Sequence, residues 1–197
     1  MPWRVGKKSN NKLYYRVLSE FMLQQTQVKT VIPYFEKFTS KFRNLNSLSR
    51  ANEKKILKLW EGLGYYRRAR NLLATSRILV KRYNSKLPRE TDEIKTLPGV
   101  GDYTSNVLAA LIYNKPTLAF DGNVKRVISR ILNMEVRKID FEIFKKINKK
   151  KIFNTNRNSD LVEAMMEFGA LVCNSKTPKC NMCPIKINCK FYKSSNK

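Results

Sequence analysis

Four cysteines stand close together near the end of this 197-residue chain, in the stretch "CNSKTPKCNMCPIKINC". Six, two and five residues separate them, and they are all the cysteines of the sequence. Thiols at such spacings can form disulfides, bind zinc or bind an iron–sulfur cluster. Zinc ribbons usually have two CxxC pairs, and this chain has one. The spacing therefore favours a metal centre over disulfides, and a [4Fe–4S] cluster over zinc, with these ligands: Cys173, Cys180, Cys183 and Cys189.

The chain is strongly basic, with 40 Lys and Arg residues against 15 Asp and Glu residues and a formal net charge of +25. A nucleic acid is the first partner to expect for such a charge. A membrane surface is a weaker alternative, because the sequence has neither an apolar run of about 18 residues nor an acid-free basic amphipathic helix. The chain also has no histidine, so its chemistry cannot use imidazole.

The first residues, "MPWRVGKKSNNK", lack the apolar segment of a signal peptide. We therefore expect an intracellular protein, where disulfides are rare. It would be cytoplasmic and associated with the nucleoid in a prokaryote, or nuclear or mitochondrial in a eukaryote.

Apolar residues recur at helical spacing through most of the chain, and no alternating strand pattern is present, so the expected fold class is all-α. Thr26 is expected to cap the second helix, and Asn52 to cap "EKKILKLW", which Gly62 and Gly64 would end. Further helices are expected in "YYRRARNLLATSRILVKRY", around the hairpin, after Asp121, in "FEIFKKINKKKI" and in "DLVEAMMEFGALVC". The tail "FYKSSNK" is expected to be frayed.

The segment "LPGVGDYTSNVLAAL" predicts two helices joined by a tight turn. Glycines on both sides of Val100 allow a sharp turn whose N–H groups are not shielded by a Cβ atom. Such groups at a helix N-terminus bind phosphate, although an ordinary turn between helices also requires a glycine. In so basic a chain we expect phosphate contacts from Gly99, Val100 and Gly101.

Several motifs resemble the adenine DNA glycosylase (MutY) family of the helix-hairpin-helix superfamily. They are "LSEFMLQQTQVKTVIPYFEKF", "LWEGLGYYRRARNL", "LPGVGDYT", "FDGNVKRV" and "EAMMEFGALVC" followed by the cysteine loop. The resemblance covers Pro2 to Cys189. It implies a monomer that binds double-stranded DNA containing a mismatched base, with the flipped base in a cleft between two lobes. It also implies a [4Fe–4S] cluster and a possible monovalent cation at the hairpin.

The implied organisation has a six-helix barrel lobe at residues 13–116 that carries the hairpin. Residues 1–12 and 117–197 would form a discontinuous cluster lobe. The family usually adds a helix before "MPWR" and a C-terminal domain that recognises 8-oxoguanine opposite the adenine. We expect this domain to be missing, which affects discrimination between 8-oxoguanine and guanine.

Removal of a purine is expected to need one protonated carboxyl and one ionised carboxylate. The first protonates the leaving base, and the second stabilises the sugar cation. Glu20 lies in the apolar stretch "VLSEFMLQQ", where burial would raise its pKa, although a surface pair with Arg16 is the plain alternative. Asp121 can cap the next helix and remain ionised. The resemblance assigns both to catalysis, with Asn123 as a neighbour, and implies that Lys125 contacts phosphate.

Tyr103 stands where members that also cut the DNA backbone have a Schiff-base lysine, so we expect base hydrolysis without strand cleavage. Other residues match family positions that enter the duplex or line the adenine pocket: Leu23, Gln24, Gln25, Val28, Tyr65, Trp3, Arg4 and Glu163. Tyr65 has a flat face that can stack on bases, whereas nearby Trp60 is interpreted as a core residue.

Two alternatives remain. Thymine–DNA mismatch glycosylases, which act on thymine or uracil opposite guanine, resemble the same lobes, lack the extra domain and also have tyrosine in the hairpin. Val28, the "QQTQ" run, "DGNV" and Glu163 favour the adenine enzymes. A non-catalytic DNA-binding module with a structural cluster is the second alternative, and the presence of Glu20 and Asp121 argues against it.

Overall fold

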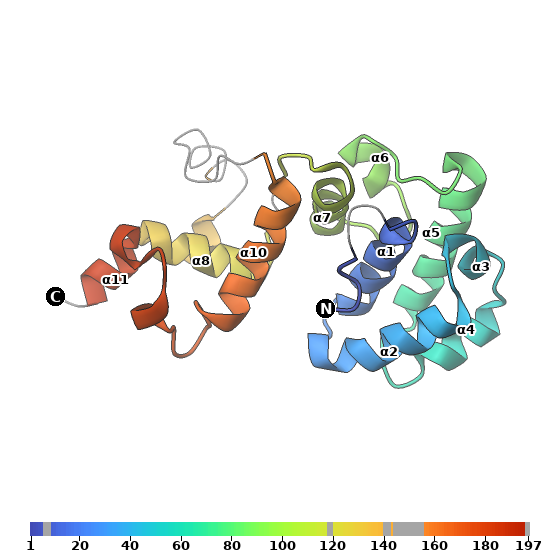
Figure 1. The fold of residues 1–197 in the computed structure, drawn as a ribbon, viewed down its shortest axis with the longest axis horizontal. Helices are drawn as coiled ribbons and strands as arrows, with labels where there is room; N and C mark the ends of the chain where they lie inside the picture. The colour runs from blue at the N-terminus through green and yellow to red at the C-terminus, as the bar shows by residue number, and fades with distance from the viewer. Residues whose placement is uncertain (6–8, 118–119, 140–142, 144–155, 196–197) are drawn as a thin grey trace. The chain divides into compact units, whose positions relative to one another are not determined.

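A computed structural model describes residues 1–5, 9–117, 120–139, 143 and 156–195 of the chain. In these residues the secondary structure is entirely helical, and no strand is present. The expected all-α class is therefore confirmed (Figure 1). None of the helices in the described part of the chain is long and apolar enough for a membrane crossing.

The chain divides into two compact units, Met1–Ile112 and Tyr113–Lys197. This division differs from the expected one, which placed residues 1–12 with the second unit and the boundary after residue 116. Trp3 explains part of the difference. Its side chain is 5% exposed and packs edge-on against Phe35 of the first unit, with 5.4 Å between the ring centroids.

The first unit is built around its longest helix, α5. The elements are α1 (Lys12–Leu23), α2 (Val28–Lys41), α3 (Leu45–Ser49), α4 (Glu53–Trp60), α5 (Arg67–Tyr83), α6 (Thr91–Lys95) and α7 (Asp102–Tyr113). Helices α1, α3 and α4 each pack against α5 (Figure 1). Trp60 is fully buried and meets the ring of Phe38 edge-on at 5.7 Å, which confirms that it is a core residue.

Two of the expected helix boundaries have different outcomes. Asn52 caps α4 as expected, since its Oδ1 accepts a hydrogen bond from the N–H of Lys54 at 2.8 Å. The expectation for Thr26 is wrong, because the residue before α2 is Gln27 and makes no side-chain capping bond. The Thr26 hydroxyl instead contacts the backbone carbonyl of Gln24 at 3.4 Å.

The second unit contains α8 (Gly122–Leu132), η1 (Val136–Lys138), α10 (Asn158–Leu171), η2 (Cys180–Met182), η3 (Lys186–Asn188) and α11 (Lys190–Ser195). Both α10 and α11 pack against α8. The helix expected in residues 141–152 lies outside the described residues, apart from residue 143. The tail expected to be frayed is helical over α11, where the Arg130 guanidinium lies 5.2 Å from the ring centroid of Phe191; its last two residues lie outside the described part of the chain.

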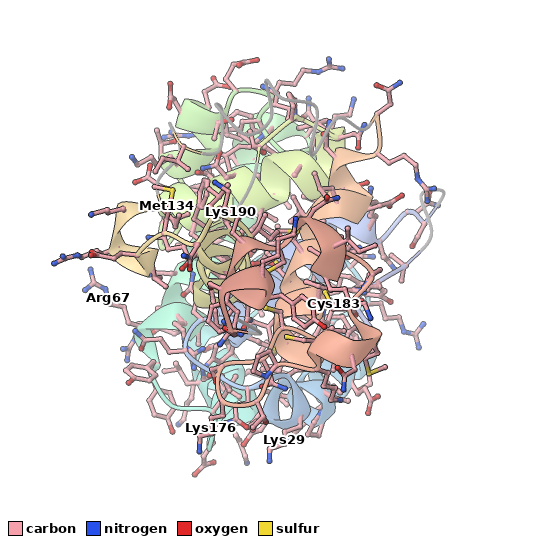
Figure 2. The ribbon with its side chains drawn as sticks, turned by 90° about the vertical axis from the view of Figure 1, so that its left-hand side faces the viewer. Lys29, Arg67, Met134, Lys176, Cys183 and Lys190 are labelled. Carbon is pink, nitrogen blue, oxygen red and sulfur yellow. The ribbon has the colours of Figure 1, made fainter. Side chains whose placement is uncertain are left out.

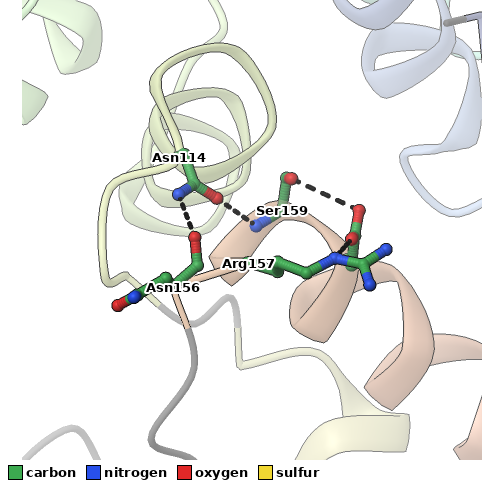
Figure 3. A network of polar contacts seen from close by, with 5 residues as sticks. Asn114, Asn156, Arg157 and Ser159 are labelled. Atoms are coloured by element: carbon green, nitrogen blue, oxygen red, sulfur yellow. Dashed lines mark hydrogen bonds and ion pairs between the residues drawn. The ribbon is translucent and has the colours of Figure 1, made fainter. Parts of the chain in front are cut away.

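Asn114 attaches the start of α10 to the chain that follows α7 (Figure 3). Its Nδ2 donates to the carbonyl of Asn156 at 2.7 Å, and its Oδ1 accepts from the N–H of Ser159 at 3.0 Å. The side chain of Asn158 in turn donates to the Asn114 carbonyl at 2.8 Å. These bonds hold the beginning of α10, the helix that packs against α8.

Candidate functional site

Glu20 lies in the last turns of α1, on the face that packs into the first unit. The residue is 9% exposed, and Val17, Leu18, Phe21 and Met22 around it in the sequence have no exposed surface. The structure therefore places Glu20 on the buried face of α1, as the apolar residues around it in the sequence suggested.

Asp121, the second candidate carboxylate, lies at the polar N-terminus of α8. Its Oδ1 accepts from the N–H of Val124 at 2.7 Å, and its Oδ2 accepts from Nδ2 of Asn123 at 3.3 Å. The expected N-cap is thus present. Both oxygens of the carboxylate therefore have a hydrogen-bond donor, and the group lies at the positive end of the α8 dipole.

Arg126, one turn further along α8, fixes Asn123. Its Nη2 donates to Oδ1 of Asn123 at 2.8 Å and to the carbonyl of Gly169 at 2.6 Å. Its Nε donates to the carbonyl of Cys173 at 3.0 Å. A continuous set of hydrogen bonds therefore runs from Asp121 through Asn123 and Arg126 to the backbone of the first cysteine.

Gly169 allows α10 to lie directly against this end of α8. A Cβ atom at Gly169 would lie 2.6 Å from Cβ of Asn123 and 3.1 Å from its carbonyl oxygen. Such distances are far inside van der Waals contact, so only glycine fits here without a shift of one helix. Glu163 is on the same helix, α10, and is half-buried. Lys125, the expected phosphate contact, is on α8 and is also half-buried.

The residues expected to enter the duplex are exposed to different degrees. Tyr65 is 66% exposed and Val28 is 37% exposed, and Gln25 is also exposed. Leu23 and Gln24 are half-buried, and Nε2 of Gln24 donates to the carbonyl of Gly99 at 3.2 Å. The structure thus brings the loop after α1 to the hairpin before α7, a contact that the sequence did not indicate.

The phosphate contacts expected at the hairpin stay predictions, and its three residues differ in how their backbone is placed. The N–H of Val100 donates to the Leu97 carbonyl at 3.0 Å, and the residue is 6% exposed. Gly99 has a φ of +78°, and a Cβ there would meet the side chain of Asn71 at 2.6 Å. Gly101 is exposed, with no atom within 4 Å of its Cβ position. It directly precedes α7, whose first N–H groups have no partner within the helix.

Three further expectations concern the hairpin and the N-terminus. Tyr103 is in the first turn of α7 and is 36% exposed. Trp3 is buried, and Arg4 beside it is half-buried. The cation expected at the hairpin stays a prediction. In the structure the carbonyls of Leu97, Pro98 and Gly99 each accept a hydrogen bond from the protein.

The four cysteines line one pocket of the second unit, together with residues of α8, α10 and α11. The pocket encloses about 390 Å³ of space, part of it open to solvent. Burial raises the pKa of the Cys183 thiol; the backbone of Ile185 lowers it, and the other three cysteines raise it further.

Cationic residues surround this pocket. Nη1 of Arg130 lies 3.4 Å from Sγ of Cys173, and Lys179 and Lys186 are among the lining residues. Lys176 and Lys190 nearby in the sequence are exposed, and Figure 2 labels them with Cys183. In the described part of the chain no group of three or more His, Cys, Asp or Glu side chains is arranged to hold a metal ion. The donor set is nevertheless four soft thiols with positive charges beside them, which fits an anionic cluster.

Sequence reasoning did not identify Arg126, Arg130 or Gly169. The two arginines follow Asn123 at helical spacing, so they share its face of α8. That spacing was a usable signal, because residues at helical spacing from Asn123 have the same neighbours across the helix packing. Nothing in the sequence indicated Gly169, since its partner is 46 residues away and is met only through the packing of α10 on α8.

Comparisons with known proteins identify the family of the chain. Residues 18–151 match the family described as "HhH-GPD superfamily base excision DNA repair protein". The chain is 41% identical over 195 residues to an adenine DNA glycosylase of Buchnera aphidicola subsp. Baizongia pistaciae, covering 98% of this chain and 54% of the relative. It is 37% identical to the enzyme of the same name from Buchnera aphidicola subsp. Schizaphis graminum, covering 100% of this chain and 56% of that relative.

The chain therefore spans about half the length of the curated relatives it matches. Among solved structures, a thermostable thymine-DNA glycosylase has the same fold, with a TM-score of 0.80 and 24% sequence identity. That match covers 98% of this chain and 88% of the other. At this identity the likeness concerns the fold.

Proposed function

Because the chain belongs to the HhH-GPD superfamily of base excision DNA repair proteins, we propose that it is a monofunctional adenine DNA glycosylase. It flips an adenine mispaired with 8-oxoguanine or guanine out of the duplex and hydrolyses its N-glycosidic bond. The observation that carries this proposal is the contrast between two carboxyls. Glu20 is buried on the inner face of α1, whereas Asp121 is a half-buried helix cap that accepts two hydrogen bonds at the N-terminus of α8.

In the proposed reaction Glu20 donates its proton to a ring nitrogen of the flipped adenine. The N-glycosidic bond then breaks, and its electron pair leaves with the base, which departs neutral. The positive charge left on the sugar is stabilised by the carboxylate of Asp121. A water molecule adds to the sugar carbon and gives its proton to the ionised Glu20. The division of labour is that of the two carboxyls of glycoside hydrolases.

Tyr103 supports the monofunctional assignment. Strand cleavage in this superfamily requires an amine that forms a Schiff base with the sugar, and a phenol cannot form one. Leu23, Gln25, Val28 and Tyr65 are proposed to enter or contact the duplex. Trp3, Arg4, Gln24 and Glu163 are proposed to line or shape the base site.

We also propose that the cysteine pocket holds a [4Fe–4S] cluster. Such a cluster binds each thiolate at a different iron atom, so its ligands surround a cavity rather than a single point. The four cysteines line such a cavity, with Arg130 beside Cys173. The cluster has a structural role here: it shapes a lysine-rich loop that contacts DNA phosphates, as do Gly101 and Lys125. The enzyme acts as a monomer on genomic DNA, in the nucleoid of a prokaryote or in the nucleus or mitochondria of a eukaryote.

The deciding experiment is single-turnover base release from four duplexes. They contain adenine opposite 8-oxoguanine, adenine opposite guanine, thymine opposite guanine and uracil opposite guanine, each analysed with and without alkali. Release of adenine, with strand breaks only after alkali, is the expected result. Release of thymine or uracil instead would assign the protein to the mismatch branch. Binding to all four duplexes without any base release would identify the protein as a non-catalytic DNA-binding module.

Glu20→Gln tests the acid in the same assay. The amide keeps the shape of the side chain but cannot protonate the base. We expect release to fall by roughly 100-fold or more while DNA binding persists. Glu36→Gln, an exposed change on α2, is the matched control and should release adenine at the wild-type rate.

A further inference from the structure

Arg68 is a buried cation of the first unit that the proposed chemistry does not use. It lies in the first turn of α5, and its residue surface is 7% exposed. Its guanidinium contacts two rings, at 5.5 Å from the ring centroid of Trp60 and 5.4 Å from that of Tyr65. Burial lowers the pKa of Arg68, and the neighbouring Tyr65 raises it.

Two segments far apart in the sequence supply the oxygens that accept from this guanidinium. The two N–H groups of Nη1 are shared among four acceptors: the carbonyls of Phe21 at 3.3 Å and Met22 at 2.9 Å, the carbonyl of Gln24, and the hydroxyl of Thr26 at 3.1 Å. Nη2 donates to the carbonyls of Leu63 at 3.0 Å and Gly64 at 3.2 Å. Five of these six acceptors are backbone carbonyls, so Arg68 fixes the course of the chain on both sides.

The two segments carry the exposed side chains proposed to enter the duplex. Gln25 has a φ of +57° and Tyr65 a φ of +49°, so both are in the left-handed region. Bulky residues without a short polar side chain rarely adopt this conformation, and such strain persists only where the surroundings hold it. Arg68 bonds to the residues on both sides of Gln25 and to the residue before Tyr65.

We propose that Arg68 is a positioning residue for base flipping, which fixes the loops of Gln25 and Tyr65 in the shape that enters the duplex before DNA arrives. This inference rests on the proposed glycosylase function. A preformed pair of loops would spare the protein the ordering of both segments at the moment when the base is unstacked. The bond from Gln24 to Gly99 extends the same support to the hairpin.

The geometry requires arginine at this position. A guanidinium is a planar fork with five donors, whereas a lysine ammonium has three donors at a single point. Arg68→Lys therefore keeps the charge but cannot bridge both segments. The matched control is Arg77→Lys on the same helix. Its guanidinium also donates to backbone carbonyls, those of Ser49 at 3.2 Å and Ala51 at 3.1 Å, which are in a segment that carries none of the proposed duplex contacts.

The first test measures amide hydrogen exchange without DNA. In Arg68→Lys, exchange in residues 23–27 and 63–67 should become faster by roughly tenfold or more, with little change in α7. Arg77→Lys should leave these two segments as they are in the wild type. Thr26→Val removes a single acceptor of Arg68 and should give a smaller change in the same direction, so a poorly folded Arg68→Lys protein does not end the test. Unchanged exchange at both segments in Arg68→Lys and Thr26→Val would overturn the proposal.

The second test compares two substrates in single turnover. One has adenine paired with 8-oxoguanine, and the other has the same adenine bulged and already unpaired. Arg68→Lys should slow release from the paired substrate by roughly 10- to 100-fold and from the bulged one much less. Equal slowing on both substrates, as a smaller folded fraction would give, contradicts a positioning role. If the wild-type chain releases no base from either substrate, the proposed function fails, and the exchange result alone decides on Arg68.

Discussion

The side-chain amide of Asn123 donates a hydrogen bond to Oδ2 of Asp121 at 3.3 Å. Oδ1 of the same carboxylate accepts from the backbone of Val124. Arg126 holds Asn123 from the other side, through Oδ1. The amide of Asn123 therefore cannot turn away without losing the bond to Arg126. Asp121 therefore contributes both a negative charge and a helix cap. Two different substitutions can test these contributions separately.

Asp121→Asn should remove the charge and keep the cap. Asparagine is as good an N-cap as aspartate, so the free energy of unfolding should change by less than about 0.5 kcal/mol. Base release should fall by roughly 100- to 1,000-fold, because the sugar cation loses its counter-charge. Asp121→Ala should lose a further ~1 kcal/mol of stability through loss of the cap. Single-turnover assays and urea unfolding measure the two effects. An active Asp121→Asn enzyme would exclude the electrostatic role.

Gly169→Ala should displace α10 from α8. The new Cβ would lie 2.6 Å from Cβ of Asn123, so one helix must move, at a typical cost of about 1–3 kcal/mol. Since Asn123 supports Asp121, we also expect base release to slow by roughly tenfold or more. Thermal unfolding and single-turnover release are the measurements.

Gly122→Ala is the matched control for stability, because a Cβ at Gly122 meets no atom within 4 Å. Its melting temperature should stay near that of the wild type. If Gly169→Ala melted at the wild-type temperature and released base at the wild-type rate, the close approach of α10 to α8 would contribute neither to stability nor to activity.

The cysteine pocket should yield iron and acid-labile sulfide, four of each per chain, when the protein is purified without oxygen. Cys183→Ser removes one soft ligand and should lower the iron content and the thermal stability of the second unit. Met182→Ser, an exposed change in the same turn, is the control and should retain iron. Metal analysis by mass spectrometry decides: one zinc per chain without sulfide would replace the cluster by a zinc site.

Tyr14 should make stability depend on alkaline pH. Its hydroxyl donates to the Phe42 carbonyl at 2.6 Å, and burial, with a smaller contribution from Tyr15, raises the pKa of Tyr14. The neutral phenol is thus favoured in the folded state. The neutral phenol of Tyr14 contributes its full stabilisation below the ordinary tyrosine pKa of about 10. This contribution is lost as the pH rises through the higher pKa that Tyr14 has in the folded state.

Tyr14→Phe removes this dependence. Near pH 7 it should lower the free energy of unfolding by about 1–3 kcal/mol, because the Phe42 carbonyl loses its donor. Above about pH 10 the difference from the wild type should shrink by up to ~1.4 kcal/mol per pH unit. Urea unfolding of both proteins across this range gives the comparison. Parallel pH curves would show that Tyr14 ionises as easily in the folded state as in the unfolded one.

Local patterns in the sequence determined the all-helical class, the cap at Asn52, the cap at Asp121 and the set of four cysteines. Each depends on residues within a few positions of one another, so short-range spacing is enough to specify it. The buried setting of Glu20 belongs to the same group, because apolar neighbours at helical spacing define the inner face of α1. The frayed tail and the cap at Thr26 were wrong, since long-range partners act on both segments: Arg130 contacts Phe191, and Arg68 contacts Thr26.

Only the tertiary structure showed how the functional residues are held. Arg126 reaches Gly169 across 43 positions, and Arg68 reaches Phe21 across 47. It also showed that the Val100 N–H is occupied by Leu97. The physical reason is that backbone carbonyls are the partners of both arginines. Every residue has such a carbonyl, so the sequence does not mark which ones accept a hydrogen bond. The packing of α5 on α1, and of α10 on α8, selects them.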